Sequence, residues 1–365
     1  MLKYAISHPW RAAIVVVVGV LLGYTGFYAY QLNTVIGLVA TESFDPGGAR
    51  AAISASQEPP TTETTVASEE IAPAGLGFDP AAESMENLTP DIPDFNLAAF
   101  GEPIPDGVFD AYLLVGSDAS GYLADAIILA LQPTDGSAPI MVSLPRDLYL
   151  WNACSRTFTR LNAGLGGCPG FASGSELMAI MVEDYTGIPI DHLARVNFDG
   201  FAAVVDALGG ITICVDNPTR DPRAELDIPE PGCQEADGET ALAWVRSRRM
   251  EQLIDGEWVV VSGSDFARQR RQQDVLFQLA ARAAGFSTPG ALTERLSAVA
   301  SAVRLDSSWS FSQAVSTAWK YRGISKSSVR RFSIKVSDYR TPAGAQVLLP
   351  RVPFRDQLSS AYPLG

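Results

Sequence analysis

The feature that most constrains this chain is an apolar segment near its N-terminus. Residues 12–32, AAIVVVVGVLLGYTGFYAYQL, contain no charged side chain. A helix of this length spans about 30 Å, which is the thickness of the hydrocarbon core of a bilayer. Lys3 and Arg11 precede the segment, whereas Glu42 and Asp45 follow it, and basic flanks stay in the cytoplasm. We therefore expect a single N-terminal transmembrane helix that acts as a signal anchor.

A cleaved signal peptide is the alternative interpretation of the same segment. Its n-region would be residues 1–11, but no small-residue cleavage site directly follows the apolar run. We favour the uncleaved anchor, with residues 1–11 as a cytoplasmic tail. The protein is then expected in the plasma membrane as a single-pass type II protein, with its C-terminal domain extracytoplasmic.

The composition changes after the anchor. Residues 33–105 are rich in Pro, Ser, Thr, Ala and Glu, carry net negative charge and show no sustained periodicity. Such a segment buries little apolar surface, so we expect a flexible acidic stalk. The folded domain is then expected over residues 106–365.

Charge and histidine content exclude several classes of function. The formal net charge of the 365 residues is -14 and the pI is about 4.6, so we expect no nucleic-acid partner. His8 and His192 are the only histidines, which argues against a histidine-based triad or a histidine-rich metal site. Of the 27 basic residues only four are lysine. Arginine is the side chain suited to bidentate contacts with phosphate or carboxylate.

The four cysteines all follow the stalk. An even number outside the cytoplasm indicates disulfides, and four cysteines allow three pairings. We favour the nearest-neighbour pairing, Cys154–Cys168 and Cys214–Cys233, because it closes two local loops. A zinc site is the alternative, but the cysteines lack C-x-x-C spacing and a nearby histidine pair.

Helices and strands are interleaved along the domain. Apolar runs predict strands in 109–116, 125–133 and 138–147, and helical spacing predicts a helix over 173–187 with a serine cap and Gly187 at its end. Residues 192–216 indicate strand, helix, Gly-Gly turn and strand. Helices are expected over 237–245, 264–285 and in 290–323, and strands over 329–336 and 345–350. This mixture predicts an α/β or α+β sandwich in one domain; we expect an α-β-α sandwich with a central mixed β-sheet flanked by helices.

Arginines gather in two neighbouring segments of this acidic chain. AWVRSRR contains Arg246 and Arg248, and the helix that begins DFARQRRQQD carries Arg268 and Arg271 on or beside its inner face. We expect Asp265 to cap this helix. Each arginine could pair with a carboxylate of its own, but together they indicate an anion between them.

Aspartates lie at the predicted ends of neighbouring strands. Asp118 follows the first strand, Asp125 begins the second, and Arg146 and Asp147 follow the third. One or two carboxylates are enough to hold Mg²⁺ when water and phosphate oxygens complete its shell. With the arginines on the other side, the sequence predicts a pyrophosphate site.

These motifs together resemble the LytR-CpsA-Psr family, in order and at similar spacing over residues 108–285. They read GSD, ADAI, SLPRD, RLNAG, GIPIDHLARVNFDGF, VDALGGITICV, DGETALAWVRSRR and SDFARQRRQQ. The resemblance implies a Mg²⁺-dependent phosphotransferase of cell-wall biogenesis. Its partners would be a polyprenyl-pyrophosphate-linked glycopolymer, peptidoglycan and the membrane. A high share of arginine among the basic residues, together with disulfides, is typical of proteins of the actinobacterial envelope.

The resemblance also implies roles for single residues. Asp118 and Asp125 would hold the Mg²⁺, and Asp147 would orient an arginine or act as a base. Arg146, Asp147, Arg246 and Arg248 would form the catalytic group. The pyrophosphate would be bound by Arg146, Arg246, Arg248, Arg268, Arg271 and Gln272, within a signature that also includes Gln273. For the cavity that holds the lipid tail, we expect contributions from Ile127, Leu129 and the helices over 177–182 and 201–208.

Two departures from the family pattern concern the loop after Asp118. No arginine lies between Asp118 and Asp125, and Ala126 stands where a threonine or serine is common. Three other functions remain open: a polyprenyl-pyrophosphate phosphatase that uses water as acceptor, a non-catalytic membrane-bound transcription attenuator or sensor, and a passive binder of wall polymer. The polymer itself could be teichoic acid, arabinogalactan or capsule.

Overall fold

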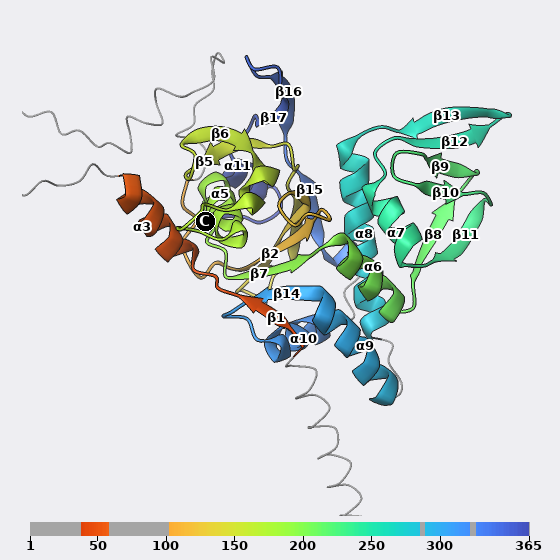
Figure 1. Ribbon diagram of the computed structural model, residues 1–365, viewed down its shortest axis with the longest axis horizontal. Coiled ribbons are helices and arrows are strands. Elements are labelled where there is room, and N and C mark those ends of the chain that lie inside the picture. The colour runs from red at the N-terminus through yellow and green to blue at the C-terminus, as the bar shows by residue number, and fades with distance from the viewer. Residues whose placement is uncertain (1–37, 58–101, 285–288, 322–325, 365) are drawn as a thin grey trace, which may run out of the picture.

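The computed structural model describes residues 38–57, 102–284, 289–321 and 326–364 (Figure 1). The expected cytoplasmic tail and transmembrane helix lie outside these ranges. None of the helices within the described ranges is both long and apolar enough to cross a bilayer.

A seven-stranded mixed sheet forms the centre of the fold. Its strands, in spatial order, are β1 (Ala40–Glu42), β14 (Val303–Asp306), β7 (His192–Val196), β2 (Phe109–Ser117), β3 (Ala124–Pro133), β4 (Ile140–Ser143) and β15 (Arg330–Ser333). β3 runs antiparallel to both β2 and β4, whereas β7 runs parallel to β2. The expected mixed sheet and the first three strands are thus confirmed.

Helix α5 (Gly174–Thr186) packs against one face of this sheet. The side chain of Ser173 accepts from the backbone N–H of Glu176 while Glu176 bonds back to Ser173, which is the reciprocal cap that the sequence predicts. Gly187 ends the helix in the left-handed conformation. Nearly every residue of α5 is buried, because the helix lies in the main core beneath the alternating apolar residues of β2 and β3.

A second group of elements packs beside the sheet. α6 (Phe198–Ala207), α7 (Gly238–Arg246) and α8 (Asp265–Ala284) enclose a second core together with two small sheets, and α8 stands between the central sheet and these sheets in Figure 1. The small sheets consist of β8 (Ile211–Val215) with β11 (Gly232–Ala236), and of β10 (Leu226–Ile228), β9 (Thr219–Asp221), β12 (Met250–Ile254) and β13 (Glu257–Ser262).

The remaining elements extend the two layers. They are β5 (Tyr149–Asn152), β6 (Thr157–Arg160), η2 (Leu161–Gly166), α9 (Pro289–Ala302), α10 (Phe311–Lys320), η3 (Lys326–Ser328), β16 (Val336–Arg340), β17 (Gln346–Pro350) and α11 (Phe354–Ser359). The expectation of helices alone over 290–323 is wrong in part, because β14 lies between α9 and α10 and pairs with β1 and β7.

The predicted stalk is wrong over part of its length. β1 joins the central sheet through β14, and α3 (Pro46–Gln57) buries Ala49 and Ile53 against the main core. Arg50 pairs with Glu183 at 3.1 Å and also with Asp184 on α5. These contacts are tertiary, so a composition typical of a linker did not reveal them.

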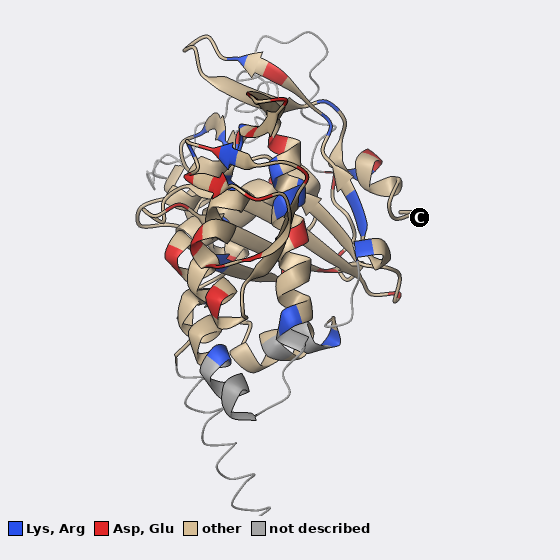
Figure 2. Cartoon of the chain, turned by 90° about the vertical axis from the view of Figure 1, so that its right-hand side faces the viewer, with Lys and Arg blue, Asp and Glu red and all other residues tan. Residues whose placement is uncertain are grey.

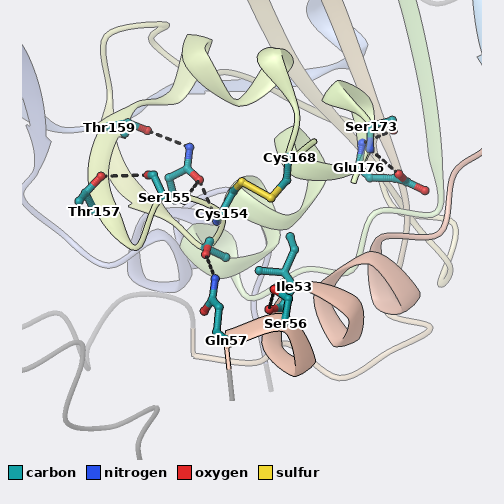
Figure 3. Close-up of a disulfide and its surroundings, with 12 residues drawn as sticks. Ile53, Ser56, Gln57, Cys154, Ser155, Thr157, Thr159, Cys168, Ser173 and Glu176 are labelled. Carbon is teal, nitrogen blue, oxygen red and sulfur yellow. Dashed lines mark hydrogen bonds between the residues drawn. A yellow bond between two sulfur atoms is a disulfide. The ribbon is translucent and has the colours of Figure 1, made fainter. Parts of the chain in front are cut away.

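Both cysteine pairs form the nearest-neighbour disulfides. Cys154–Cys168 lies beneath the end of α3, where the side chain of Gln57 donates to the carbonyl of Ala153 at 2.8 Å (Figure 3). Cys214–Cys233 joins residues that face each other on β8 and β11. All four cysteines are therefore oxidised, and the zinc alternative is wrong.

Candidate active site

A cavity of about 470 Å³ opens between the central sheet and the second group of elements. Its floor comes from one edge of the central sheet, where β2, β4 and β7 end and β3 begins. Its walls come from α6, α7 and α8. One part of the lining is apolar and the other is rich in arginine.

The apolar part comes from strands and from the inner faces of three helices. It is lined by Leu114, Val115, Ile128, Phe198, Phe201, Val204, Leu242, Leu276, Leu279 and Val303. Phe201 and Val204 confirm the contribution expected from the helix over 201–208. The expectation for Ile127, Leu129 and residues 177–182 is wrong, because these side chains are buried in the main core on the α5 side. Side chains alternate along a strand, so Ile128 reaches the cavity and its two neighbours do not.

Arg146 and Asp125 meet at the sheet edge. Arg146 follows β4 and donates from one terminal nitrogen to the carboxylate of Asp125 at the start of β3. Its Nε also lies 3.7 Å from Asp147. Arg146 and Asp125 both line the cavity. Their expected roles as a pyrophosphate contact and a metal ligand stay predictions.

Arg248 and Arg268 share one carboxylate. Asp265 accepts from Arg248 at 2.9 Å and lies 2.6 Å from Arg268. Arg268 is only 3% exposed, and desolvation lowers the pKa of its guanidinium to about 10, with the positive charges of Arg248 and Arg146 contributing. A buried cation held among other cations favours an anion close by.

Asp147 acts on arginines rather than on the cavity. It lies within 3.5 to 3.7 Å of guanidinium nitrogens of Arg146, Arg160 and Arg248, and it does not line the cavity. Of the two roles that the resemblance implies for it, this position favours the orientation of arginines over that of a base.

Asp221 accepts hydrogen bonds from the Ser247–Arg249 turn. It was not among the predicted site residues. Its buried carboxylate accepts from the hydroxyl of Ser247 at 2.8 Å and from the backbone N–H groups of Arg248 and Arg249 at 3.0 and 2.9 Å. Burial raises the pKa of Asp221, but these hydrogen bonds outweigh burial and lower it. The carboxylate thereby fixes the direction in which the two arginines leave the backbone.

The other members of the two arginine motifs divide between the cavity and the protein interior. Arg246 lines the cavity with its guanidinium 4.6 Å from the ring centre of Phe198, and Gln272 lines it too. Arg271 does not line the cavity, because it donates to the carbonyl groups of Trp244, at 3.2 Å, and Ser247. Gln273 is buried and donates to Ser143 at 2.9 Å.

The first turn of α8 is capped by a different residue from the one expected. The hydroxyl of Ser264 accepts from the backbone N–H of Ala267, so Ser264 caps the helix in place of Asp265, whose carboxylate binds the arginines. Arg270, on the same helix, is exposed. On the side of the molecule that Figure 2 presents, basic and acidic segments of the chain are interspersed.

Asp118 lies outside the cavity lining. Its carboxylate accepts from the hydroxyl of Ser120 at 2.7 Å and from the backbone N–H groups of Gly121 and Leu123 at 2.9 and 3.3 Å. Desolvation raises the pKa of Asp118, but these bonds outweigh it and lower the pKa. In the described part of the chain, no three carboxylate, histidine or cysteine side chains gather as a metal site. Asp125 alone of the two expected ligands lines the cavity, and among the described residues only Arg146 bonds to it, through one of its two oxygens.

The sequence of this chain matches a known protein family. The family model described as LytR_cpsA_psr matches residues 111–353. The chain belongs to the LytR_cpsA_psr family.

Individual relatives agree with this membership. A "Probable cell wall biosynthesis protein LcpB" of Corynebacterium glutamicum is 39% identical over 133 residues, which cover 36% of this chain and 30% of that protein. A "Polyisoprenyl-teichoic acid--peptidoglycan teichoic acid transferase TagU" of Halalkalibacterium halodurans is 30% identical over 205 residues, covering 55% and 59%. The matches thus span less than two thirds of the length of these relatives.

Solved structures share the fold. The "LytR-Csp2A-Psr enzyme from Actinomyces oris" is similar with a TM-score of 0.56 and 27% identity, over 71% of this chain and 92% of that one. TagV of Bacillus subtilis, with a TM-score of 0.55 and 22% identity over 70% of this chain and 96% of that one, shows the same fold. The expected α/β architecture with a central mixed sheet is therefore that of the LytR_cpsA_psr family.

Several polar residues of the cavity were not predicted. They are Ser117, Arg195, Asn197, Asp221, Arg223 and Arg249. Arg249 continues the RSRR run and could have been included on that ground. Arg195 lies within a strand that the sequence predicts, but only the pairing of β7 with β2 brings it to the site.

Proposed function

We propose that this chain is a phosphotransferase that moves a polyprenyl-pyrophosphate-linked glycopolymer onto a hydroxyl group of peptidoglycan. One observation carries the proposal. Arg146, Arg248 and Arg268 line the same cavity, and each keeps a buried Nε–H that forms no hydrogen bond with a described residue. Buried donors are normally satisfied, so three of them beside an apolar cavity favour an anionic ligand with an apolar tail.

The two parts of the cavity match the two parts of such a donor. Guanidinium groups can grip phosphate oxygens with two parallel hydrogen bonds, and the apolar lining would take the first isoprene units. The names of the relatives support this choice, because TagU is named as a transferase of polyisoprenyl-linked teichoic acid to peptidoglycan.

We further propose that Mg²⁺ binds at the carboxylates of Asp125 and Asp118. Asp125 has an oxygen without a partner among the described residues, and oxygen is the donor that Mg²⁺ prefers. When bound, the ion would supply positive charge to the phosphates. Asp118 would have to share a carboxylate that already accepts three hydrogen bonds within its own loop, so we assign Asp125 the larger part.

The transfer breaks one phosphorus–oxygen bond and forms another. The acceptor hydroxyl oxygen attacks the sugar-linked phosphorus, the bond to the polyprenyl phosphate breaks, and the polymer becomes attached through a phosphodiester. The hydroxyl proton passes to the leaving polyprenyl phosphate, since a loose phosphoryl transition state needs little assistance from a base. Arg146, Arg246, Arg248 and Arg268 stabilise the charge that moves onto the leaving phosphate.

The location of the protein belongs to the same proposal. The apolar segment over 12–32 would anchor the chain in the plasma membrane, with the folded domain outside the cytoplasm. The two disulfides support an extracytoplasmic domain, because they persist in oxidising compartments. The cavity would then face the compartment that contains both the lipid-linked donor and peptidoglycan.

A transfer assay on the full-length chain in detergent tests the proposal. The protein would be incubated with Mg²⁺, a labelled polyprenyl-pyrophosphate oligosaccharide and purified peptidoglycan, and the label in the washed wall counted. We expect Arg146→Ala to lose transfer by about 100-fold or more, whereas Arg270→Ala, an exposed arginine of α8, keeps it. Full transfer by Arg146→Ala would contradict the proposal, and label released only into solution would indicate a hydrolase instead.

A further inference from the structure

A buried hydroxyl group without a partner lies at the edge of the cavity. Ser117 ends β2 and is 1% exposed, yet its Oγ forms no hydrogen bond with any described residue. It lines the cavity beside Asp125 and Arg146. A buried hydroxyl without a partner is unfavourable for the fold, so its position is better explained by a ligand than by packing.

Arg195 reaches the same region from the neighbouring strand. It lines the cavity from β7, where it is paired in register with Val115 of β2. A terminal nitrogen of its guanidinium lies 4.0 Å from the position that a Cβ at Gly121 would occupy, which places the guanidinium at the turn between β2 and β3. That turn, residues 118–123, contains no basic side chain.

Arg195 also differs from the paired arginines of the site. Arg146, Arg248 and Arg268 each lie beside a carboxylate. No carboxylate of a described residue lies within ion-pair distance of Arg195, and it forms no hydrogen bond within the described ranges. Its strand neighbour Arg304 on β14 is also basic. Two arginines side by side without a carboxylate are unfavourable unless an anion lies close to one of them.

The sheet places these groups in a row. Arg195, Ser117, Asp125 and Arg146 come from β7, β2, β3 and the segment after β4, which are adjacent in the sheet and meet at one edge. Neighbouring strands lie about 4.8 Å apart, so the row is about 14 Å long. Arg146, which pairs with Asp125, is at one end of the row, and Arg195 is at the other.

We propose that Ser117 and Arg195 bind one phosphate of the donor pyrophosphate, while Arg146, Arg248 and Arg268 bind the other. The hydroxyl of Ser117 donates one hydrogen bond to a phosphate oxygen, and the guanidinium of Arg195 donates two. The assignment rests on the proposed function, because it takes a polyprenyl pyrophosphate as the ligand of the cavity. It makes the cavity selective for two linked phosphates over one.

Two probes measure this selectivity on the full-length protein in detergent: a short-chain polyprenyl pyrophosphate and the monophosphate of the same chain length. We expect the wild type to bind the pyrophosphate more tightly. Arg195→Gln should weaken pyrophosphate binding by about tenfold to 100-fold and Ser117→Ala by about tenfold, with monophosphate binding nearly unchanged. Arg304→Gln is the matched control, since Arg304 is an exposed arginine that does not line the cavity, and it should leave both affinities unchanged.

The outcomes separate the two proposals. Wild-type selectivity retained by both Arg195→Gln and Ser117→Ala would overturn the assignment of the second phosphate, while tight binding of the pyrophosphate would still support the proposed function. Failure of the wild type to bind either probe would overturn both. The melting temperature of Ser117→Ala adds a check: we expect it to stay unchanged or rise, and a lowered value with unchanged affinities would show that the hydroxyl is structural.

Discussion

We expect the buried charge of Arg268 to lower the free energy of unfolding while it contributes to ligand binding. Its side chain is 4% exposed, and the one carboxylate that pairs with it among the described residues, Asp265, is shared with Arg248. Replacement by methionine removes the buried charge and keeps a long flexible side chain. Asp265 keeps Arg248 as its partner at 2.9 Å, so the substitution leaves no carboxylate unpaired.

The pKa of Arg268 gives the magnitude. Desolvation lowers it from its usual value to about 10, and at 1.36 kcal/mol per pKa unit the charged form costs the folded state about 3 kcal/mol. Because folding lowers this pKa, the penalty is complete below about pH 10 and is relieved only as the pH rises above that value. At neutral pH we therefore expect Arg268→Met to stabilise the fold by about 1–3 kcal/mol, which raises the melting temperature by about 2–10 °C.

Thermal unfolding at neutral pH, with and without a short-chain polyprenyl pyrophosphate, measures both effects. The ligand should raise the melting temperature of the wild type and fail to raise that of Arg268→Met. Arg270→Met, at an exposed position of the same helix, should match the wild type in both respects. A variant Arg268→Met that is less stable than the wild type by more than about 1 kcal/mol would refute the reasoning, because its charge would then be well compensated in the fold.

Three further substitutions test other parts of the account. Asp221→Ala should lower donor affinity. Hydrogen bonds lower the pKa of Asp221 in the folded state, so the wild type loses part of its unfolding free energy as the pH falls below about 4, and the variant should lack this loss. Equal acid sensitivity of both proteins would contradict this. Ile53→Ala should cost about 2–5 kcal/mol, because Ile53 is the 2% exposed side chain by which α3 packs on the main core, and a denaturant midpoint equal to that of the wild type would mean that α3 does not dock. Replacing Cys214 and Cys233 together by serine should lower the free energy of unfolding by about 3 kcal/mol, because the disulfide closes a loop with a sequence separation of 19. A loss of transfer without a loss of stability would instead assign the disulfide to the site.

Much of the fold was predictable wherever a local signal existed. The capping residues of α5, the alternation along β2 and the Gly-Gly turn before β8 all specify their elements within a few residues of sequence. The arginine part of the site was predictable for a related reason, because two short basic motifs supply most of it. Family resemblance then brought together motifs that lie far apart along the chain.

The rest depends on tertiary contacts. β1 is three residues long and gains its partner only when β14 arrives from the other end of the domain. Ser117 and Asp221 look like ordinary strand or turn residues in the sequence. The fold leaves the hydroxyl of Ser117 without a hydrogen-bond partner among the described residues and places Asp221 beneath the Ser247–Arg249 turn. The hairpin of β12 and β13, by contrast, does not depend on tertiary contacts for its signal. Its turn is Asp255–Gly256, with both residues at positive φ, and this dipeptide is a recognised hairpin signal in a sequence.

A count of both reaction products distinguishes transfer to peptidoglycan from hydrolysis. The full-length chain would be given Mg²⁺ and the labelled lipid-linked donor, with peptidoglycan either present or omitted, and two products would be counted: polymer bound to the wall and polyprenyl monophosphate released. We expect equal amounts of wall-bound polymer and polyprenyl monophosphate when peptidoglycan is present, and almost no monophosphate when peptidoglycan is omitted. Monophosphate released at the same rate without peptidoglycan would contradict the account, because water would then be the acceptor.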